Sequence, residues 1–382
     1  MGYIALGDLI SKAQVEKCGK REYPVLSMTM HDGIVFQNDR FKKDIASIDR
    51  SNYSVVGFNQ LVVSFPIDEG VLAVQDIADA GIVSPAYKIW DIDQAKLVPK
   101  YLEMWLRSPR SIDYYKSKLR GTTARRRSIP EEDFLEMRVN VPPKEEQERI
   151  VDLLTRVKGV MLLREQELVA LDDLIKARFV EMFGDIIRNN KGWPQYVFSD
   201  IATSRLGKML DAKQQTGKYK YPYLANFNVH WFRLELENLN EMDFNEADQV
   251  EFQLKDGDLL VCEGGEIGRC AVWHNEVQPC YFQKALHRVR CNSDVVLPDY
   301  LARWFQYNCD HDGFASIEGA KATIAHLPGS KLKLLKVTVP PINLQKQFVT
   351  FVAQVDKSKS VIQKSLDETQ LLFDSLMQKY YG

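Results

Sequence analysis

Apolar side chains recur at alternating steps of four and three residues in two segments of the chain, which is the pattern of a heptad seam on a long helix. Arg164 and Arg178 interrupt the first seam, and Lys359 and Thr369 interrupt the second. The apolar positions of the first are Ile150, Leu154, Val157, Met161, Leu168, Leu171, Ile175 and Met182. Those of the second are Phe348, Val352, Val355, Ile362, Leu366, Phe373, Leu376 and Tyr380. Two helices of about 38 residues, each about 57 Å long, are therefore expected.

Each predicted helix follows a pair of prolines, which suit an extended entry and a first helical turn. The polar positions of one seam fall where the other seam is apolar, so long Arg and Lys stems can lie over apolar side chains of the opposite helix. We therefore expect the helices to pair as an antiparallel coiled coil. The alternative is two separate amphipathic helices, each packed on its own domain.

The chain contains an internal repeat of two similar halves. The sequence VNVPPKEEQERIVDLL, which begins at Val139, recurs as VTVPPINLQKQFVTFV at Val337, 198 positions later. The same offset aligns Gly121 with Gly319 and Gly184 with Gly382. A tandem repeat of this kind predicts two similar domains related by a pseudo-twofold axis. The predicted segments are two variable regions, 1–138 and 185–336, and two long helical segments, 139–184 and 337–382.

The variable regions combine short β-rich runs with Gly-containing turns and one helical stretch near the end of each. This mixture predicts an α+β fold with a twisted, mostly antiparallel sheet plus short helices. The turn EGGEIG, which begins at Glu263, lacks the spacing of a phosphate-binding loop and is followed by the strand-like RCAVW. It is interpreted as a connection between strands.

Bulk composition gives no sign of a nucleic-acid-binding protein, because the net charge is -2 and the pI is about 6.4. Any such role needs cations gathered on one surface. The first variable region has such a cluster between Trp105 and Ser128, where Asp113 is the single acid. Its candidate DNA-binding residues are Arg107, Arg110, Lys116, Lys118, Arg120, Thr122, Thr123, Arg125, Arg126 and Arg127. Lysine and arginine suit a phosphate backbone, and arginine can also read guanine. A solvated helix face followed by a basic loop is the simpler interpretation.

The second copy carries different side chains on the equivalent loop. Its sequence GAKATIAHL keeps the glycine but replaces the three arginines. The candidates in this half are Arg205, Lys208, Lys213, Lys218, Arg269, Lys321, Thr323 and His326. Lys220 extends the basic run, and Arg288 and Arg290 alternate on a predicted strand. A common scaffold with different reading side chains is expected.

No catalytic constellation is visible. The Pro-Pro pairs lack the preceding Asn or Asp and following aromatic residue of an amino-methyltransferase, and there is no Walker A lysine loop. The six cysteines contain no CxxC pair, so reduced thiols in a cytoplasm fit better than disulfides or a zinc site, and no metal site is predicted. Neither an export signal nor a membrane-spanning run is present.

These features together resemble the specificity subunit of type I restriction-modification systems. The resemblance rests on the paired V-x-V-P-P-x(3)-Q segments with their long helices, the loop GTTARRRSIP with its counterpart GAKATIAHLP, and the GGEIGR turn. It covers essentially the whole chain. It implies that each variable region is a target recognition domain for one half of a bipartite double-stranded DNA site, and that the helices set the spacer.

The same resemblance implies partners. The helices would dock two modification subunits, which bind S-adenosylmethionine and methylate adenine. Restriction subunits, where present, would use ATP and Mg²⁺. This chain would hold no cofactor and perform no catalysis itself. Two alternatives stay open: a recognition subunit of a methylation-only or other defence assembly, and a coiled-coil scaffold whose variable domains bind proteins.

Overall fold

The computed structural model describes residues 2–30, 32–40, 49–119, 129–211, 215–314 and 326–382. These residues form two compact units. Unit 1 contains Met1–Gln166 together with Gln363–Gly382, and unit 2 contains Glu167–Ile362. Each unit therefore combines one variable region with part of both long helices.

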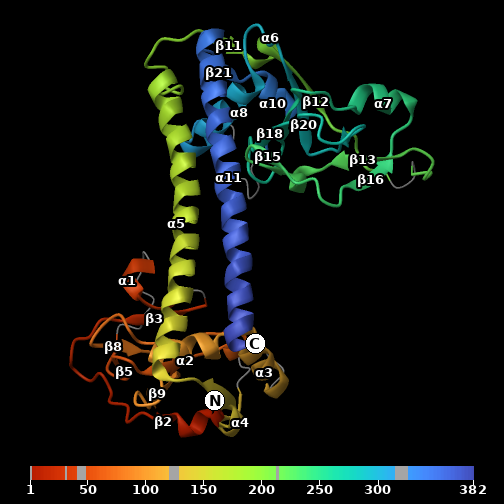
Figure 1. Cartoon of the computed structure of the whole chain (residues 1–382). Coiled ribbons are helices and arrows are strands. Elements are labelled where there is room, and N and C mark those ends of the chain that lie inside the picture. The colour runs from red at the N-terminus through yellow and green to blue at the C-terminus, as the bar shows by residue number, and fades with distance from the viewer. Residues whose placement is uncertain (1, 31, 41–48, 120–128, 212–214, 315–325) are drawn as a thin grey trace. The chain divides into compact units, whose positions relative to one another are not determined.

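Unit 1 is built around a four-stranded antiparallel sheet in the order β2-β9-β6-β7, of which β2 and β9 are labelled in Figure 1. Its strands are β2 (Ile10–Lys12), β9 (Lys88–Ile92), β6 (Leu61–Val63) and β7 (Leu72–Val74). Three antiparallel pairs accompany it: β1 (Gly2–Ala5) with β10 (Arg138–Val141), β3 (Leu26–Thr29) with β4 (Gly33–Phe36), and β5 (Ser54–Gly57) with β8 (Ala80–Val83). The α-helices of the variable region are α1 (Gln37–Arg40), α2 (Pro99–Leu106), α3 (Pro109–Lys118) and α4 (Glu131–Glu136).

Unit 2 repeats the central sheet in the order β12-β20-β17-β18. Its strands are β12 (Ala202–Leu206), β20 (Leu286–Cys291), β17 (Leu259–Cys262) and β18 (Cys270–Val272). A second sheet, β16-β13-β19, contains β16 (Asn240–Asp243), β13 (Lys220–Leu224) and β19 (Tyr281–Phe282), with β13 and β19 parallel. Two pairs are β11 (Gln195–Val197) with β21 (Lys336–Thr338), and β14 (Val229–His230) with β15 (Arg233–Leu234). The helices are α6 (Phe198–Ile201), α7 (Glu246–Phe252), α8 (Pro298–Asp310) and α10 (Gly329–Lys333).

The registers of the two central sheets reproduce the sequence repeat. Leu61 pairs with Val74 in unit 1, and Leu259 pairs with Val272 in unit 2, so both partners are displaced by 198 positions. On the other side, Leu61 pairs with Trp90 whereas Leu259 pairs with Val289. Unit 2 therefore carries one extra residue before β20.

Two helices of 40 residues each, α5 (Lys144–Phe183) and α11 (Ile342–Tyr381), contribute to both units. In unit 2, Lys359 Nζ lies 2.6 Å from Asp172 Oδ1. Six residues further along α5, the Arg178 guanidinium lies over the Phe351 ring, 5.7 Å from its centroid, so α11 runs in the opposite direction. In unit 1, the start of α5 meets the end of α11, where Arg149 donates to the Tyr380 hydroxyl at 3.4 Å. The predicted antiparallel coiled coil is confirmed.

Burial follows the heptad pattern along both helices. Every predicted seam residue is buried or half-buried, and so are the polar seam residues Arg164, Arg178, Lys359 and Thr369. The Arg178 guanidinium over the Phe351 ring shows how a cationic seam residue can contact an apolar neighbour on the opposite helix. Charged residues beside the seam, such as Asp152 and Lys158, are exposed.

The end of each long helix packs on an equivalent tyrosine. Phe183, at the end of α5, meets Tyr300 edge-to-face at a centroid distance of 5.0 Å in unit 2. Tyr381, at the end of α11, lies 5.4 Å from the Tyr101 ring in unit 1. All four side chains are buried, so each unit closes its core with the final turn of the helix that follows the other variable region.

The helical stretch predicted near the end of the first variable region is two helices, α2 and α3. Ser108 separates α2 from α3 and accepts a hydrogen bond from the Ser111 N–H at 3.3 Å, while Pro109 occupies the first position of α3. A serine cap followed by proline starts a new helix and ends the previous one.

Candidate nucleic-acid interface

Two of the unit 1 arginines predicted to bind DNA make internal contacts. Arg107, whose side chain is 20% exposed, lies 3.5 Å from the buried Glu103 carboxylate and donates to the Met30 carbonyl oxygen. Arg110 donates to the Tyr3 hydroxyl and to the carbonyl oxygen of Gly382, each at 3.0 Å. Arg110 thus satisfies a carbonyl at the end of α11, where a cation is favoured by the helix dipole.

The two lysines on α3 differ in their surroundings. Lys118 pairs with Asp133 at 3.1 Å, and its ammonium lies 5.9 Å from the centroid of the Tyr114 ring. Lys116 is exposed and makes no ion pair with any residue that the structure describes. The remaining unit 1 candidates, Arg120, Thr122, Thr123, Arg125, Arg126 and Arg127, lie outside the described residues.

Unit 2 places Arg205 on the edge strand β12. Its guanidinium forms an ion pair with Glu251 of α7 and lies over the Phe252 ring, 5.8 Å from the centroid. Lys213, Lys321 and Thr323, also predicted to contact DNA, lie outside the described residues.

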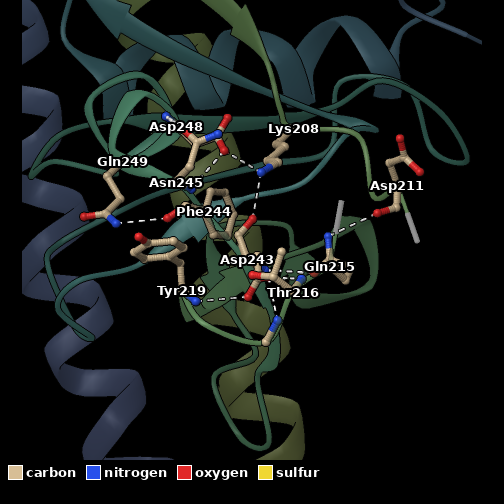
Figure 2. Close-up of polar contacts among 11 residues, drawn as sticks. Lys208, Asp211, Gln215, Thr216, Tyr219, Asp243, Phe244, Asn245, Asp248 and Gln249 are labelled. Atoms are coloured by element: carbon tan, nitrogen blue, oxygen red, sulfur yellow. Dashed lines mark hydrogen bonds and ion pairs between the residues drawn. The ribbon is translucent and has the colours of Figure 1, made fainter. Parts of the chain in front are cut away.

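Lys208 is an internal anchor rather than an exposed cation. Its side chain is 11% exposed, and Nζ donates to Asp248 Oδ2 at 2.5 Å and to the Asp243 carbonyl oxygen at 2.7 Å (Figure 2). Asp248 also forms the capping box of α7 with Asn245. Because breaking such a pair leaves an uncompensated charge, Lys208 fixes the start of the loop that leads to β13.

The same loop is held at its other end by Asp243, which is 4% exposed. The Asp243 carboxylate accepts hydrogen bonds from the Thr216 N–H, the Thr216 hydroxyl at 2.8 Å, the Gly217 N–H at 2.7 Å and the Tyr219 N–H at 3.2 Å (Figure 2). Burial by itself would raise the pKa of Asp243, but the Thr216 hydroxyl and these backbone donors lower it overall. The carboxylate is thus an ionised centre for the loop.

The described residues of this loop expose Lys218, Tyr219 and Lys220 next to one another. Lys218 and Lys220 make no ion pair with the described residues. The sequence interpretation singled out the lysines but neither Tyr219 nor Asp243. The alternation KYKYPY is the signal that could have indicated Tyr219, because it interleaves aromatic residues with lysines, whereas the role of Asp243 depends on contacts between residues 24 to 27 positions apart.

Arg269 and His326 meet at the EGGEIG turn. Arg269 donates to the Asn226 carbonyl oxygen at 3.0 Å and lies 3.7 Å from Glu266, so its cation holds the turn to the segment before β14. The exposed His326 bridges to Gly264, and the following Leu327 N–H donates to the Glu263 carbonyl oxygen at 2.7 Å. This turn connects β17 to β18 as expected and anchors the chain immediately after residues 315–325.

A buried histidine supports this anchor. His287 is 1% exposed, and its Nε2 lies 3.1 Å from the Leu327 carbonyl oxygen. Burial lowers the pKa of His287 despite opposing contributions from that carbonyl and Glu263. A neutral ring with a proton on Nε2 can donate to Leu327 and fix the chain there.

The cysteines Cys270, Cys280 and Cys291 have raised pKa values and are therefore poor nucleophiles. All six are free thiols. Burial raises the pKa of Cys280 and of Cys291 to about 12, and that of Cys270 well above its usual value, so these thiols stay protonated. Within the described ranges no group of three or more His, Cys, Asp and Glu residues is arranged to hold a metal ion.

The outer faces of the long helices expose large apolar side chains at positions related by the repeat. Leu163 is 60% exposed and Val361 is 66% exposed, while Leu174 is 46% exposed and Leu372 is 52% exposed. Both pairs are 198 positions apart. Leu163 and Leu372 belong to unit 1, and Leu174 and Val361 to unit 2. No helix among the described residues is long and apolar enough to cross a membrane.

Comparison with known proteins shows what this chain is similar to. Residues 190–369 match the family described as the type I restriction modification DNA specificity domain. The chain has the fold of solved type I specificity subunits: the one from M. genitalium aligns with 100% of this chain and 96% of its own length, with a TM-score of 0.55 and 14% identity. A chain from a study of complex assembly and conformational transition of the type I restriction-modification system aligns with a TM-score of 0.59 and 14% identity, covering 99% of this chain and 97% of that one.

A curated relative points to the same class. The putative type I restriction enzyme MjaX specificity subunit of Methanocaldococcus jannaschii is 22% identical over 176 residues, which are 45% of this chain. The match spans 41% of that relative's length. The resemblance to type I specificity subunits predicted from the sequence is confirmed, with residues 190–369 matching the model of a DNA specificity domain.

Proposed function

We propose that this chain recognises a bipartite sequence in double-stranded DNA, with each unit reading one half. The observation that carries the proposal is the repetition of one central sheet at an offset of 198 residues, with different side chains around it. Only the second copy lies within the matched DNA specificity domain, and the first has the same sheet. Two similar folds with different surfaces suit two different half-sites.

The two long helices would act as the ruler between the half-sites. Each rises about 1.5 Å per residue, and their buried seam resists sliding because a shift would expose apolar side chains. Inserting four residues after Leu168, about 6 Å of helix, should lengthen the recognised spacer or abolish recognition. An unaltered target motif would contradict the proposal that the helices set the spacer length.

The exposed apolar residues on the outer helix faces would dock two modification subunits. Because Leu163 and Leu372 in unit 1 match Val361 and Leu174 in unit 2, a partner that binds one set can bind the other in the same way. Large exposed apolar side chains at repeated positions suit a protein interface.

Catalysis would reside in those partners. The modification subunits would bind S-adenosylmethionine and methylate adenine, and restriction subunits, where the system has them, would use ATP and Mg²⁺. This chain would recognise the DNA sequence, set the spacer between the half-sites and bind the partner subunits, in the cytoplasm. A methylation-only assembly would use it in the same way.

Binding to duplex DNA as a function of salt tests the proposal. Phosphate contacts release counterions, so affinity should fall steeply with salt concentration. Replacing Arg125, Arg126 and Arg127 with alanine should weaken binding to the cognate duplex while assembly with the modification subunit stays intact. A wild-type chain that assembles but shows no salt-dependent affinity for any duplex would favour the coiled-coil scaffold instead.

A further inference from the structure

We propose that Tyr219 is a specificity-determining residue of unit 2, whose ring contacts the bases of the second half-site, and that Asp243 positions it. This inference rests on the proposed function and assigns part of the second reading surface. It concerns the described residues of the loop between Lys208 and Lys220, which Asp243 and Asp248 hold through Lys208, Thr216 and Tyr219 (Figure 2).

The loop is held rigidly at both stems. Lys208 ties its start to Asp248 and to the Asp243 backbone, and the Asp243 carboxylate gathers four donors from Thr216, Gly217 and Tyr219. Gly207, just before it, could not carry a side chain, because an added Cβ would lie 2.3 Å from the Gln283 backbone. Such preorganisation lowers the entropy cost of binding.

Tyr219 is fixed by its backbone and remains partly exposed. Its N–H donates to Asp243, and its carbonyl oxygen accepts from the Phe244 N–H at 2.9 Å. The residue is 45% exposed. Its ring joins no aromatic or cation–π pair, and its hydroxyl makes no hydrogen bond, with any residue that the structure describes. The fold therefore fixes the backbone of Tyr219 and leaves nearly half of the residue accessible.

The neighbours of Tyr219 suit DNA. Lys218 and Lys220 are exposed and carry charges that no described acid neutralises, so they can contact phosphates on either side of the aromatic ring. An aromatic ring can contact a thymine methyl group or stack on a base, and its hydroxyl can bond a base edge. Met209 and Leu210 on the same loop are 60% and 49% exposed and add apolar surface.

The test compares variants of the full chain assembled with its modification subunits. Tyr219→Ala and Tyr219→Phe are measured against Tyr196→Ala, because Tyr196 of β11 is a similarly exposed tyrosine of unit 2, at 40%. Affinity is measured on the cognate duplex and on duplexes with each half-site position substituted. Melting temperatures establish that the variants are folded.

Tyr219→Ala should bind the cognate duplex about ten-fold more weakly or worse and lose discrimination at one or two positions of the second half-site only, because single base contacts are worth about that much. Lys218→Ala should weaken all duplexes alike and reduce the salt slope by about one unit. Thr216→Ala removes one hydrogen bond to Asp243 and should loosen the loop. As a single substitution it should lower the discrimination between half-site sequences, and when added to Tyr219→Ala it should have no further effect.

Tyr219→Ala with unchanged discrimination at every position would overturn the inference, as would a loss of modification-subunit binding with intact DNA affinity, which would assign the loop to a protein interface. Additive effects of Thr216→Ala and Tyr219→Ala would overturn the positioning role. The proposed function fails separately, if the wild-type assembly itself shows no preference among duplexes.

Discussion

Gln147 and Gln345 occupy equivalent places in the two units and make the same set of backbone hydrogen bonds. The Gln147 side chain accepts from the Val98 N–H at 2.9 Å and donates to the carbonyl oxygens of Lys96 and Pro142. The Gln345 side chain accepts from the Leu297 N–H at 2.9 Å and donates to those of Val295 and Pro340. Each glutamine thus joins the first turn of a long helix to the segment before α2 or α8.

Replacing either glutamine with alanine should therefore destabilise the unit that contains it. Both side chains are fully buried, so the change leaves backbone groups without partners and costs about 3 kcal/mol. Urea unfolding measures this loss. Gln370→Ala, an exposed change on α11, is the control and should alter the free energy of unfolding by less than about 0.5 kcal/mol. Similar losses for Gln147→Ala and the control would show that the buried hydrogen bonds contribute little.

Lys208 should matter for stability rather than for direct DNA contact. Lys208→Ala leaves Asp248 without its cation in a half-buried site and should lower the free energy of unfolding by about 3 kcal/mol. Lys218→Ala, at an exposed position, should leave stability unchanged and weaken DNA binding. Parallel measurements of unfolding and of DNA affinity distinguish the two. A fully stable Lys208→Ala protein with reduced affinity would instead make Lys208 a DNA contact.

Charged substitutions on the outer helix faces should remove modification subunits one at a time. Leu163→Lys with Leu372→Lys alters unit 1, and Leu174→Lys with Val361→Lys alters unit 2. Each pair should reduce the bound partners from two to one, since a charge is costly in an apolar interface, and all four changes should abolish binding. Native mass spectrometry reads the stoichiometry directly.

Gln166→Lys adds a similar charge at an exposed polar position of α5 and serves as the control for these helix variants. All of the altered residues are exposed, so the melting temperature should not move. Retention of both partners by the fourfold variant would place the docking surface elsewhere.

Protonation of His287 should make unit 2 less stable in mild acid. Its pKa is lowered below the ordinary value of 6.5, chiefly by burial, so the unfolded chain takes up a proton more readily than the folded one. Stability is therefore retained above pH 6.5 and lost as the pH falls below it toward the folded pKa. Melting temperatures between pH 7.5 and pH 5.5 should show a steeper decline for the wild type than for His287→Gln.

His274→Gln, at an exposed position of unit 2, is the control for the effect of replacing a histidine with glutamine outside the core. An undiminished decline in His287→Gln would assign the acid sensitivity to other groups.

The periodicity of the sequence determines much of the fold. Helix seams at Ile150, Leu154 and Phe348 and the repeat at Val139 and Val337 are local or translational patterns, and they predicted the long helices, their pairing and the two similar domains. The individual strands and their pairing are harder to predict from the sequence, because a short apolar run pairs with partners that are distant in the chain.

The roles of single cations could not be predicted from charge alone. Arg205 and Lys208 are basic in sequence, but Glu251 and Asp248, which pair with them, lie 40 or more residues away. Arg110 contacts Gly382, the most distant residue along the chain. Exposed and structural cations look alike until the tertiary contacts are known.

Unit 1 is assembled from both ends of the sequence, since residues 363–382 complete the core around Tyr101 and Leu154. During synthesis, the first variable region therefore emerges before Tyr381, whose side chain its core needs. Until then, the seam at the start of α5 lacks its native cover and is open to incorrect pairing. Unit 1 therefore cannot complete its core until residues 363–382 are available, although its variable region precedes that of unit 2 in the chain.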